Sequence, residues 1–171
     1  MRMIDERPAE AGNRAQAGHW EGDLIMGAGN RSAIGTLIER TTRYLILLGF
    51  PDGMAGTDAV RQAITDALER IPVGLRQTLT WDQGKELAQH LQITAQTSTD
   101  VFFCDAHSPW QRGSNENMNG LLRDYFPKGT NLSIHAAEQL AAVAAELNQR
   151  PRKTLGWCRP ADLFNSELAA A

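Results

Sequence analysis

Apolar residues alternate with polar residues near the start of this chain, and further along they recur every three or four positions. The first segment, residues 19–27, alternates, and two more β-rich segments follow at 32–40 and 42–50. Such alternation is typical of strands, and the short polar connections favour an antiparallel meander. The apolar spacing over 56–71 is that of one face of a helix, and Pro72 follows it. The sequence therefore predicts a meander followed by a helix.

The rest of the sequence alternates between short strand patterns and helical patterns. Strands are predicted at 77–82 and 99–105, and helices at 85–93, 115–126 and 134–149. This order predicts an α/β fold with a five-stranded mixed sheet flanked by helices. Because crossovers between parallel strands are right-handed, we expect the strand at 77–82 to lie beside the first strand and parallel to it.

Composition excludes several classes of protein. With 171 residues the chain has room for one domain with a real core. No apolar run approaches the roughly 20 residues that a membrane helix needs. Two cysteines, Cys104 and Cys158, cannot build a disulfide framework, which favours the reducing cytoplasm. The net charge of −3 argues against a stand-alone nucleic-acid binder, because such proteins are usually basic.

Three carboxylates stand where the predicted fold lets them converge. Asp23 and Asp82 both lie late in predicted strands, and ligands of open α/β sheets gather near the carboxyl ends of strands. Glu116 lies at the start of a predicted helix, where negative charge also suits the helix dipole. Three carboxylates form a hard, oxygen-only donor set that suits Mg²⁺ or Mn²⁺. Two such ions, about 3.5–4 Å apart, can hold the attacking and leaving oxygens of a phosphoryl displacement.

Five segments resemble the catalytic region of insertion-sequence-thirty-type DDE transposases. They are GHWEGDLIMG, TLIERTTRY, TWDQGKELAQH, FFCDAHSPWQRGSNENMNGLLRDYFPKGT and LNQRPRKTLGW. The resemblance runs from about residue 6 to 163, and its most specific feature is the interval of 33 residues between Asp82 and Glu116. It implies a ribonuclease-H-like, retroviral-integrase-like fold. It also implies that Asp23, Asp82 and Glu116 are the catalytic, metal-binding DDE triad.

The same resemblance implies the catalytic core of a bacterial transposase. Two Mg²⁺ or Mn²⁺ ions would support 3′-end cleavage and strand transfer on double-stranded DNA, at element ends and target. The active complex would be a cytoplasmic homo-oligomer. Transposases of this type carry an N-terminal helix-turn-helix region. Residues 1–17, which are polar and aperiodic, are therefore expected to be a linker or remnant after such a region, and 18–171 the catalytic core.

Two other functions fit the same residues. A ribonuclease-H-like nuclease would hydrolyse nucleic acid without joining it. A domesticated module would bind DNA or support assembly without catalysis, and the intact triad argues against it. A metal-dependent strand-transfer assay on pre-cleaved ends separates all three functions.

Candidates for DNA contacts surround the predicted triad. They are Arg112, Asn119, Arg123, Lys128, Arg150, Arg152 and Lys153. For each cation taken singly, solvated surface charge is the simpler interpretation, and the RPRK run favours DNA for the cluster. Trp81 and Trp157 are predicted in the core rather than as platforms for stacked bases. Trp110, in a loop with proline and glycine, fits either role, as a core residue or as a platform for a stacked base.

Four further polar residues each have two interpretations. Glu21 shares the strand face of the first predicted ligand, and Glu86 follows the second by one helical turn. Each either supports the triad or is a solvated or helix-compensating carboxylate, which is the simpler interpretation. His19 and His107 either form hydrogen bonds within the fold or contact the site or DNA.

Overall fold

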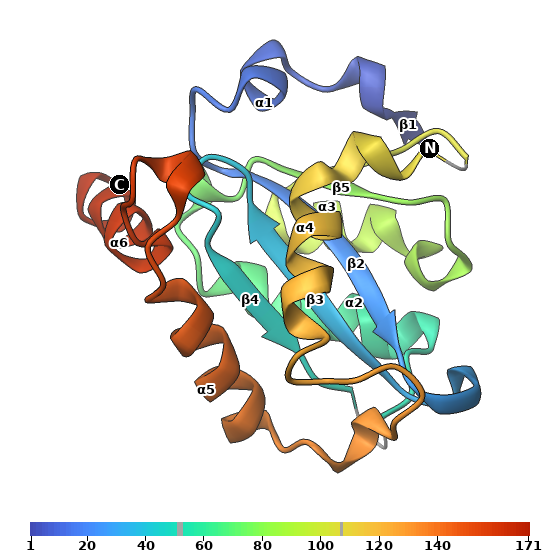
Figure 1. Ribbon diagram of the computed structural model, residues 1–171. Helices are drawn as coiled ribbons and strands as arrows, with labels where there is room; N and C mark the ends of the chain where they lie inside the picture. The colour runs from blue at the N-terminus through green and yellow to red at the C-terminus, as the bar shows by residue number, and fades with distance from the viewer. Residues whose placement is uncertain (51–52, 107) are drawn as a thin grey trace.

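The centre of the fold is a mixed sheet (Figure 1). The structure is a computed structural model and describes residues 1–50, 53–106 and 108–171. In spatial order the six strands are β1 (Arg2–Met3), β6 (Asp100–Phe103), β5 (Thr78–Trp81), β2 (His19–Met26), β3 (Ala33–Glu39) and β4 (Leu45–Leu48). β2, β3 and β4 form the antiparallel meander, whereas β1, β6, β5 and β2 run parallel to one another. The predicted mixed sheet and the position of β5 beside β2 are confirmed.

The predicted count of five strands is wrong by one, because β1 adds a sixth strand at the edge beside β6. Arg2 and Met3 pair with Phe102 and Phe103. The Arg2 guanidinium also lies 4.5 Å from the centre of the Phe102 ring. A strand of two residues leaves no alternation in the sequence, so the pattern of apolar residues could not predict it.

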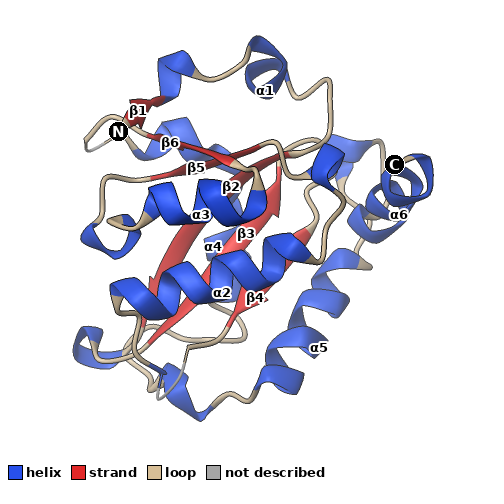
Figure 2. Cartoon of the chain, turned by 180° about the vertical axis from the view of Figure 1, so that it is seen from behind, coloured by secondary structure: helices blue, strands red, loops and turns tan. Residues whose placement is uncertain are grey.

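Helices cover both faces of the sheet (Figure 1, Figure 2). α2 (Thr57–Glu69) and α3 (His90–Thr97) lie on one face, and α4 (Gly113–Leu122) and α5 (Ala137–Asn148) lie on the other. The predicted helix at 85–93 is divided between a 3-10 turn and α3. Two helices that the sequence pattern does not predict are α1 (Ala9–Asn13) and α6 (Pro160–Ala170). No helix in the described ranges is both long and apolar enough to cross a membrane.

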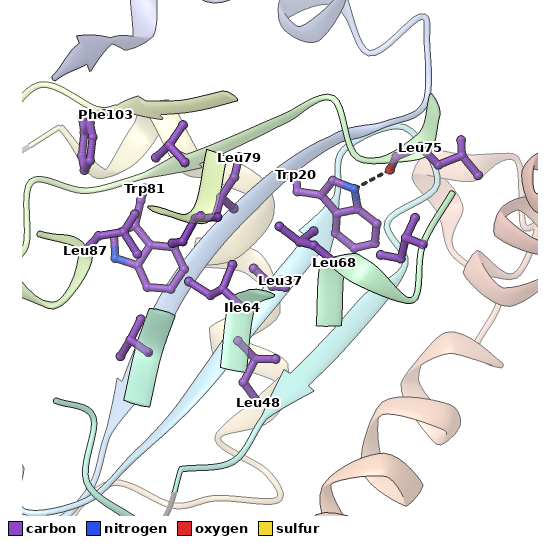
Figure 3. Close-up of a cluster of buried hydrophobic side chains, with 14 of the residues drawn as sticks. Trp20, Leu37, Leu48, Ile64, Leu68, Leu75, Leu79, Trp81, Leu87 and Phe103 are labelled. Carbon is purple, nitrogen blue, oxygen red and sulfur yellow. Dashed lines mark hydrogen bonds between the residues drawn. The ribbon is translucent and has the colours of Figure 1, made fainter. Parts of the chain in front are cut away.

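The larger apolar core lies between the sheet and α2 (Figure 3). Trp20 and Trp81 are both fully buried there, and Nε1 of Trp20 donates a 2.8 Å hydrogen bond to the carbonyl of Leu75. Gly22 lies directly against the Trp81 indole, and a Cβ at this position would overlap the ring. Because Gly22 has no side chain, the Trp81 indole can lie against β2, next in sequence to the predicted ligand Asp23.

The segment 1–17 packs against the sheet, although the sequence predicted a linker or remnant. Ala11 is fully buried and Ala17 nearly so. Nη1 of Arg7 donates a 2.9 Å hydrogen bond to Oγ1 of Thr80 on β5. The predicted domain boundary at residue 18 stays a prediction, but the preceding segment contributes directly to the surroundings of β2 and β5.

Candidate functional site

Two of the predicted carboxylates lie on neighbouring parallel strands. In the β2–β5 ladder, His19 pairs with Thr78 and Glu21 with Thr80. The same register continued by two residues places Asp82, which follows the last residue of β5, opposite Asp23. Alternation along each strand directs both aspartates to the face that α4 covers, away from the tryptophan core.

Helix α4 crosses that face and contacts Asp23 directly. Nδ2 of Asn119 donates a 3.0 Å hydrogen bond to Oδ2 of Asp23, and the backbone N–H of Leu24 donates to Oδ1 at 2.8 Å. Oδ1 of Asp82 accepts a 3.1 Å hydrogen bond from the backbone N–H of Gly84. Both aspartates are half-buried, so each is oriented by the fold and still accessible.

Glu116 lies in the first turn of α4, three residues before Asn119, and its side chain is exposed. Across the described parts of the chain, no three Asp, Glu, His or Cys side chains gather closely enough to hold one metal ion. The triad residues therefore come from the expected elements but are not gathered into one site. Their oxygen-only chemistry and accessibility fit Mg²⁺ or Mn²⁺, and binding requires the carboxylates to draw together.

A buried ion pair lies beside the triad, between β2 and the start of α4. Glu21 is fully buried, and its Oε1 lies 2.9 Å from Nη1 of Arg40, although the two groups are not aligned for a hydrogen bond. Oε2 of Glu21 accepts a 3.1 Å hydrogen bond from the backbone N–H of Asn115. Burial lowers the pKa of Arg40 to about 10, and the Glu21 carboxylate opposes this shift. The solvated interpretation of Glu21 is wrong, because this carboxylate binds the first turn of α4.

Two further arginines meet at the side chain of Ser114, which is also buried. Nη1 of Arg14 and Nη1 of Arg43 each donate a 2.8 Å hydrogen bond to its Oγ. Burial lowers the pKa of Arg43, and the neighbouring charge of Arg14 adds to that effect. These arginines and Ser114 were not among the residues predicted from sequence. The sequence contained only a weak signal for this network, because Glu21 alone among its residues shares a strand face with a predicted metal ligand, Asp23.

Of the other polar candidates, His19 and Glu86 have partners within the fold. His19 is buried and its Nδ1 lies 2.8 Å from Oγ1 of Thr78, which confirms the structural interpretation. Oε1 of Glu86 accepts a 3.1 Å hydrogen bond from Nε1 of Trp81, so Glu86 orients the side chain of Trp81, the residue before Asp82. His107 lies outside the described residues.

Most of the predicted DNA-contact residues have partners within the fold. Arg123 donates to the carbonyls of Met26 and Phe126, and Arg152 donates to the carbonyl of Leu147. Asn119 binds Asp23, and Arg150 donates to Tyr125 and lies 3.5 Å from Glu146. Lys128 and Lys153 are exposed. The side chain of Arg112 lies outside the described part of the chain.

Two tryptophans are exposed, Trp110 and Trp157. Trp81 is buried as predicted, but the prediction for Trp157 is wrong, because this side chain is 66% exposed. Trp157 follows Gly156 in a turn and has a left-handed backbone with φ of 67°, which directs it out of the core. Trp110 is 71% exposed, so it is not a core residue either.

The sequence of this chain is similar to those of curated transposases. The chain is 51% identical over 169 residues to the transposase for insertion sequence element IS1086 of Cupriavidus metallidurans, covering 99% of this chain and 49% of the relative. It is 49% identical over 168 residues to the transposase InsI for insertion sequence element IS30C of Escherichia coli, covering 97% and 43%. The chain thus spans about half the length of these curated relatives. The predicted resemblance to insertion-sequence-thirty-type transposases is confirmed.

Similarity of structure extends to a viral complex. A chain of the simian T-cell lymphotropic virus intasome, solved with a PP2A regulatory subunit, superposes with a TM-score of 0.59 at 16% identity, covering 78% of this chain and 49% of that one. At this identity the likeness concerns the fold alone, and it confirms the predicted integrase-like architecture. Residues 13–109, more than half of the sequence, match the integrase core domain, a range that includes Asp23 and Asp82 and ends before Glu116. The chain therefore belongs to the integrase core domain family.

Proposed function

We propose that this chain is the catalytic core of a bacterial DDE transposase that cleaves the 3′ ends of its element and transfers them to target DNA. The observation that carries this proposal is that β2, the end of β5 and α4 come together. Asp23 lies on β2, Asp82 directly follows the adjacent parallel strand β5, and α4, which carries Glu116, is bound to Asp23 through Asn119. The relatives named as transposases agree with it over nearly the whole of this chain.

Asp23, Asp82 and Glu116 are the residues that would hold two Mg²⁺ or Mn²⁺ ions. When bound, such ions lower the pKa of a coordinated water and neutralise charge that develops on a phosphoryl group. The chain's own residues orient the ligands. Asn119 and the Leu24 N–H fix the two oxygens of Asp23, and the Gly84 N–H fixes one oxygen of Asp82. Without cations, three neighbouring carboxylates repel one another, which favours an open arrangement of the site.

Double-stranded DNA is the proposed substrate, at element ends and at the target. The exposed cations Lys128 and Lys153 are suited to phosphate contacts, which position a duplex without reading its sequence. Arg150 is also exposed, whereas Arg123 and Arg152 are committed to backbone carbonyls. We also propose that the active form is a homo-oligomer in the bacterial cytoplasm, because two element ends must be processed together.

The experiment uses the full-length protein and a duplex with the element's terminal sequence. Cleavage and joining are measured with intact and pre-cleaved ends in Mg²⁺, in Mn²⁺ and with a chelator. A transposase joins pre-cleaved ends to target DNA in the presence of metal. Release of product without joining would assign the nuclease function instead, and binding without either reaction would assign the non-catalytic module.

A further inference from the structure

We infer that Ser114, held by Arg14 and Arg43, is a positioning residue that sets the direction of Glu116 toward the two aspartates. This inference rests on the proposed function and identifies how the third carboxylate is placed. Ser114 lies two residues before Glu116 in the same turn of α4. Its hydroxyl is the meeting point of two guanidinium groups, each at 2.8 Å, from segments 100 and 71 residues away in sequence.

The side chains of α4 divide into three neighbouring stripes. Residues four apart on a helix lie on one stripe, and successive residues are turned by about 100°. Asn115 and Asn119 form the middle stripe, which faces the sheet. The Asn115 side chain donates to Oγ1 of Thr36 on β3 at 3.4 Å and its backbone N–H donates to Glu21, whereas the Asn119 side chain donates to Asp23 on β2. Ser114 stands on one side of this stripe and Glu116 on the other. The strand contacts therefore fix the position of α4. The Ser114 contacts act together with Met118 and Leu122, which are buried on the same stripe, to fix the rotation of the helix about its own axis.

The spacing of the two strand contacts supports this view. Four residues along a helix rise about 6.0 Å, and two residues along a strand extend about 6.6 Å. The Asn115 N–H and the Asn119 side chain thus match Glu21 and Asp23 in spacing, so α4 runs along β2 at these two contacts. A helix held along one line can still roll about that line. The Ser114 contacts lie off the line and, with the buried Met118, oppose a roll of the first turn that would move Glu116 away from Asp23.

Burial makes the Ser114 contact costly to break. Ser114 is only 3% exposed, and Arg14 and Arg43 are half-buried. Nη1 of Arg14 also donates a 2.9 Å hydrogen bond to the carbonyl of Arg40, which is the residue paired with Glu21. Removal of the hydroxyl takes this acceptor from Nη1 of Arg43, which must move to find another, whereas Nη1 of Arg14 keeps the Arg40 carbonyl. The network therefore links the segment 1–17 to the first turn of α4.

The test removes the hydroxyl and compares it with a matched serine. Ser114→Ala is the primary variant and Ser114→Thr keeps the hydroxyl. Ser32→Ala is the control, because Ser32 is 4% exposed and its Oγ accepts a 2.9 Å hydrogen bond from the Leu132 N–H, away from α4. A double variant, Arg14→Gln with Arg43→Gln, removes the same contact from the donor side.

Two quantities are measured in the full-length protein with duplex DNA: Mn²⁺ affinity by electron paramagnetic resonance and the Mg²⁺ concentration for half-maximal cleavage. We expect Ser114→Ala and the double variant to weaken both by about tenfold, the scale of losing a group that orients a metal ligand. Ser114→Thr should stay close to wild type. Ser32→Ala should lose stability without a change in metal affinity.

Two outcomes separate this inference from the proposed function. If Asp82→Asn and Glu116→Gln abolish cleavage while Ser114→Ala and the double variant behave like Ser32→Ala, the positioning inference is overturned and the proposed function stands. If Asp82→Asn and Glu116→Gln leave metal-dependent cleavage intact, the proposed function fails, and the positioning of Glu116 fails with it.

Discussion

Asn119 on α4 donates a 3.0 Å hydrogen bond to Asp23 on β2, across 96 residues of sequence. The sequence predicts Asn119 among the DNA contacts, whereas the structure gives it a carboxylate partner inside the protein. A donor that binds one oxygen of Asp23 fixes the plane of the carboxylate, which suits a metal ligand. The contact also ties the helix that carries Glu116 to the strand that carries Asp23.

Replacing Asn119 by Ala should lower metal-dependent cleavage by about 10- to 100-fold, because Asp23 loses the group that orients it. Asn119→Asp should lower it further, since a second carboxylate beside Asp23 adds repulsion. Cleavage rates at saturating DNA measure the effect. Asn117→Ala is the control, because Asn117 is an exposed amide on the same helix. Equal losses in Asn117→Ala and Asn119→Ala would show that the contact with Asp23 is not the cause.

Replacing Asp82 by Asn should abolish cleavage and joining in the full-length protein while barely changing its stability. The amide oxygen still accepts from the Gly84 N–H, but the charge that a hard cation needs is lost. In metal-free buffer the melting temperature should stay level or rise, because one charge leaves a repelling cluster. Asp124→Asn, an exposed change on the same domain, should keep activity. Near-normal strand transfer by the Asp82 variant would refute the triad.

Replacing Gly22 by Ala should destabilise the fold by about 1–3 kcal/mol, because the new methyl group overlaps the Trp81 ring in a packed core. Urea unfolding followed by tryptophan fluorescence measures the loss. Gly120→Ala is the matched control, because a Cβ at Gly120 would meet no neighbouring element within 4 Å and alanine favours a helix interior. It should be neutral or stabilising. A stable Gly22→Ala protein would mean that the Trp81 ring can shift to make room for the methyl group.

Replacing Glu21 by Gln should cost about 3–5 kcal/mol, the usual loss when one partner of a buried ion pair is removed. Arg40 would then keep its charge in a buried site without a carboxylate. The double variant Glu21→Gln with Arg40→Met should recover part of that loss. Free energies of unfolding for the two single variants and the double variant form the test. Strict additivity of the three values would show that Glu21 and Arg40 are energetically independent.

This chain should bind duplex DNA weakly and with little regard to sequence. Element ends should be favoured over scrambled duplex by less than about tenfold, or roughly 1.4 kcal/mol. Lys153→Gln should weaken binding to both about equally and reduce the salt dependence, because an exposed cation contacts phosphate. Arg70→Gln, an exposed change at the end of α2 on the other face, should have no effect. Titrations at several salt concentrations measure all three, and a stronger preference for the ends would contradict the prediction.

Local patterns were sufficient to predict the elements that carry the triad. Alternation along 19–27 assigned Asp23 to one face of β2, and the order of strands and helices placed β5 beside it. Helical spacing placed Met118 and Leu122 in the core and Glu116 away from it, as the structure confirms. These features depend on neighbours in sequence and on the handedness of crossovers, so a single sequence contains enough information for them.

The buried network could not be predicted in the same way. Glu21, Arg40 and Ser114 are each ordinary polar residues in sequence, and their burial depends on three segments that meet only after folding. Trp157 shows the opposite failure, because its size predicts burial but its turn has a left-handed backbone that exposes it. In both cases tertiary packing overrides the preference of the residue type.

The two-residue strand β1 covers the edge of β6. β6 is a short, almost wholly apolar strand, and its outer backbone groups would otherwise be free to pair with another chain. Arg2 covers this edge with a charged side chain that stacks on Phe102 and lies 3.5 Å from Asp100. Short, charged edge strands are a common means of preventing sheets from joining edge to edge. Loss of Arg2 and Met3 would therefore affect solubility and aggregation before it affected the chemistry of the distant carboxylates.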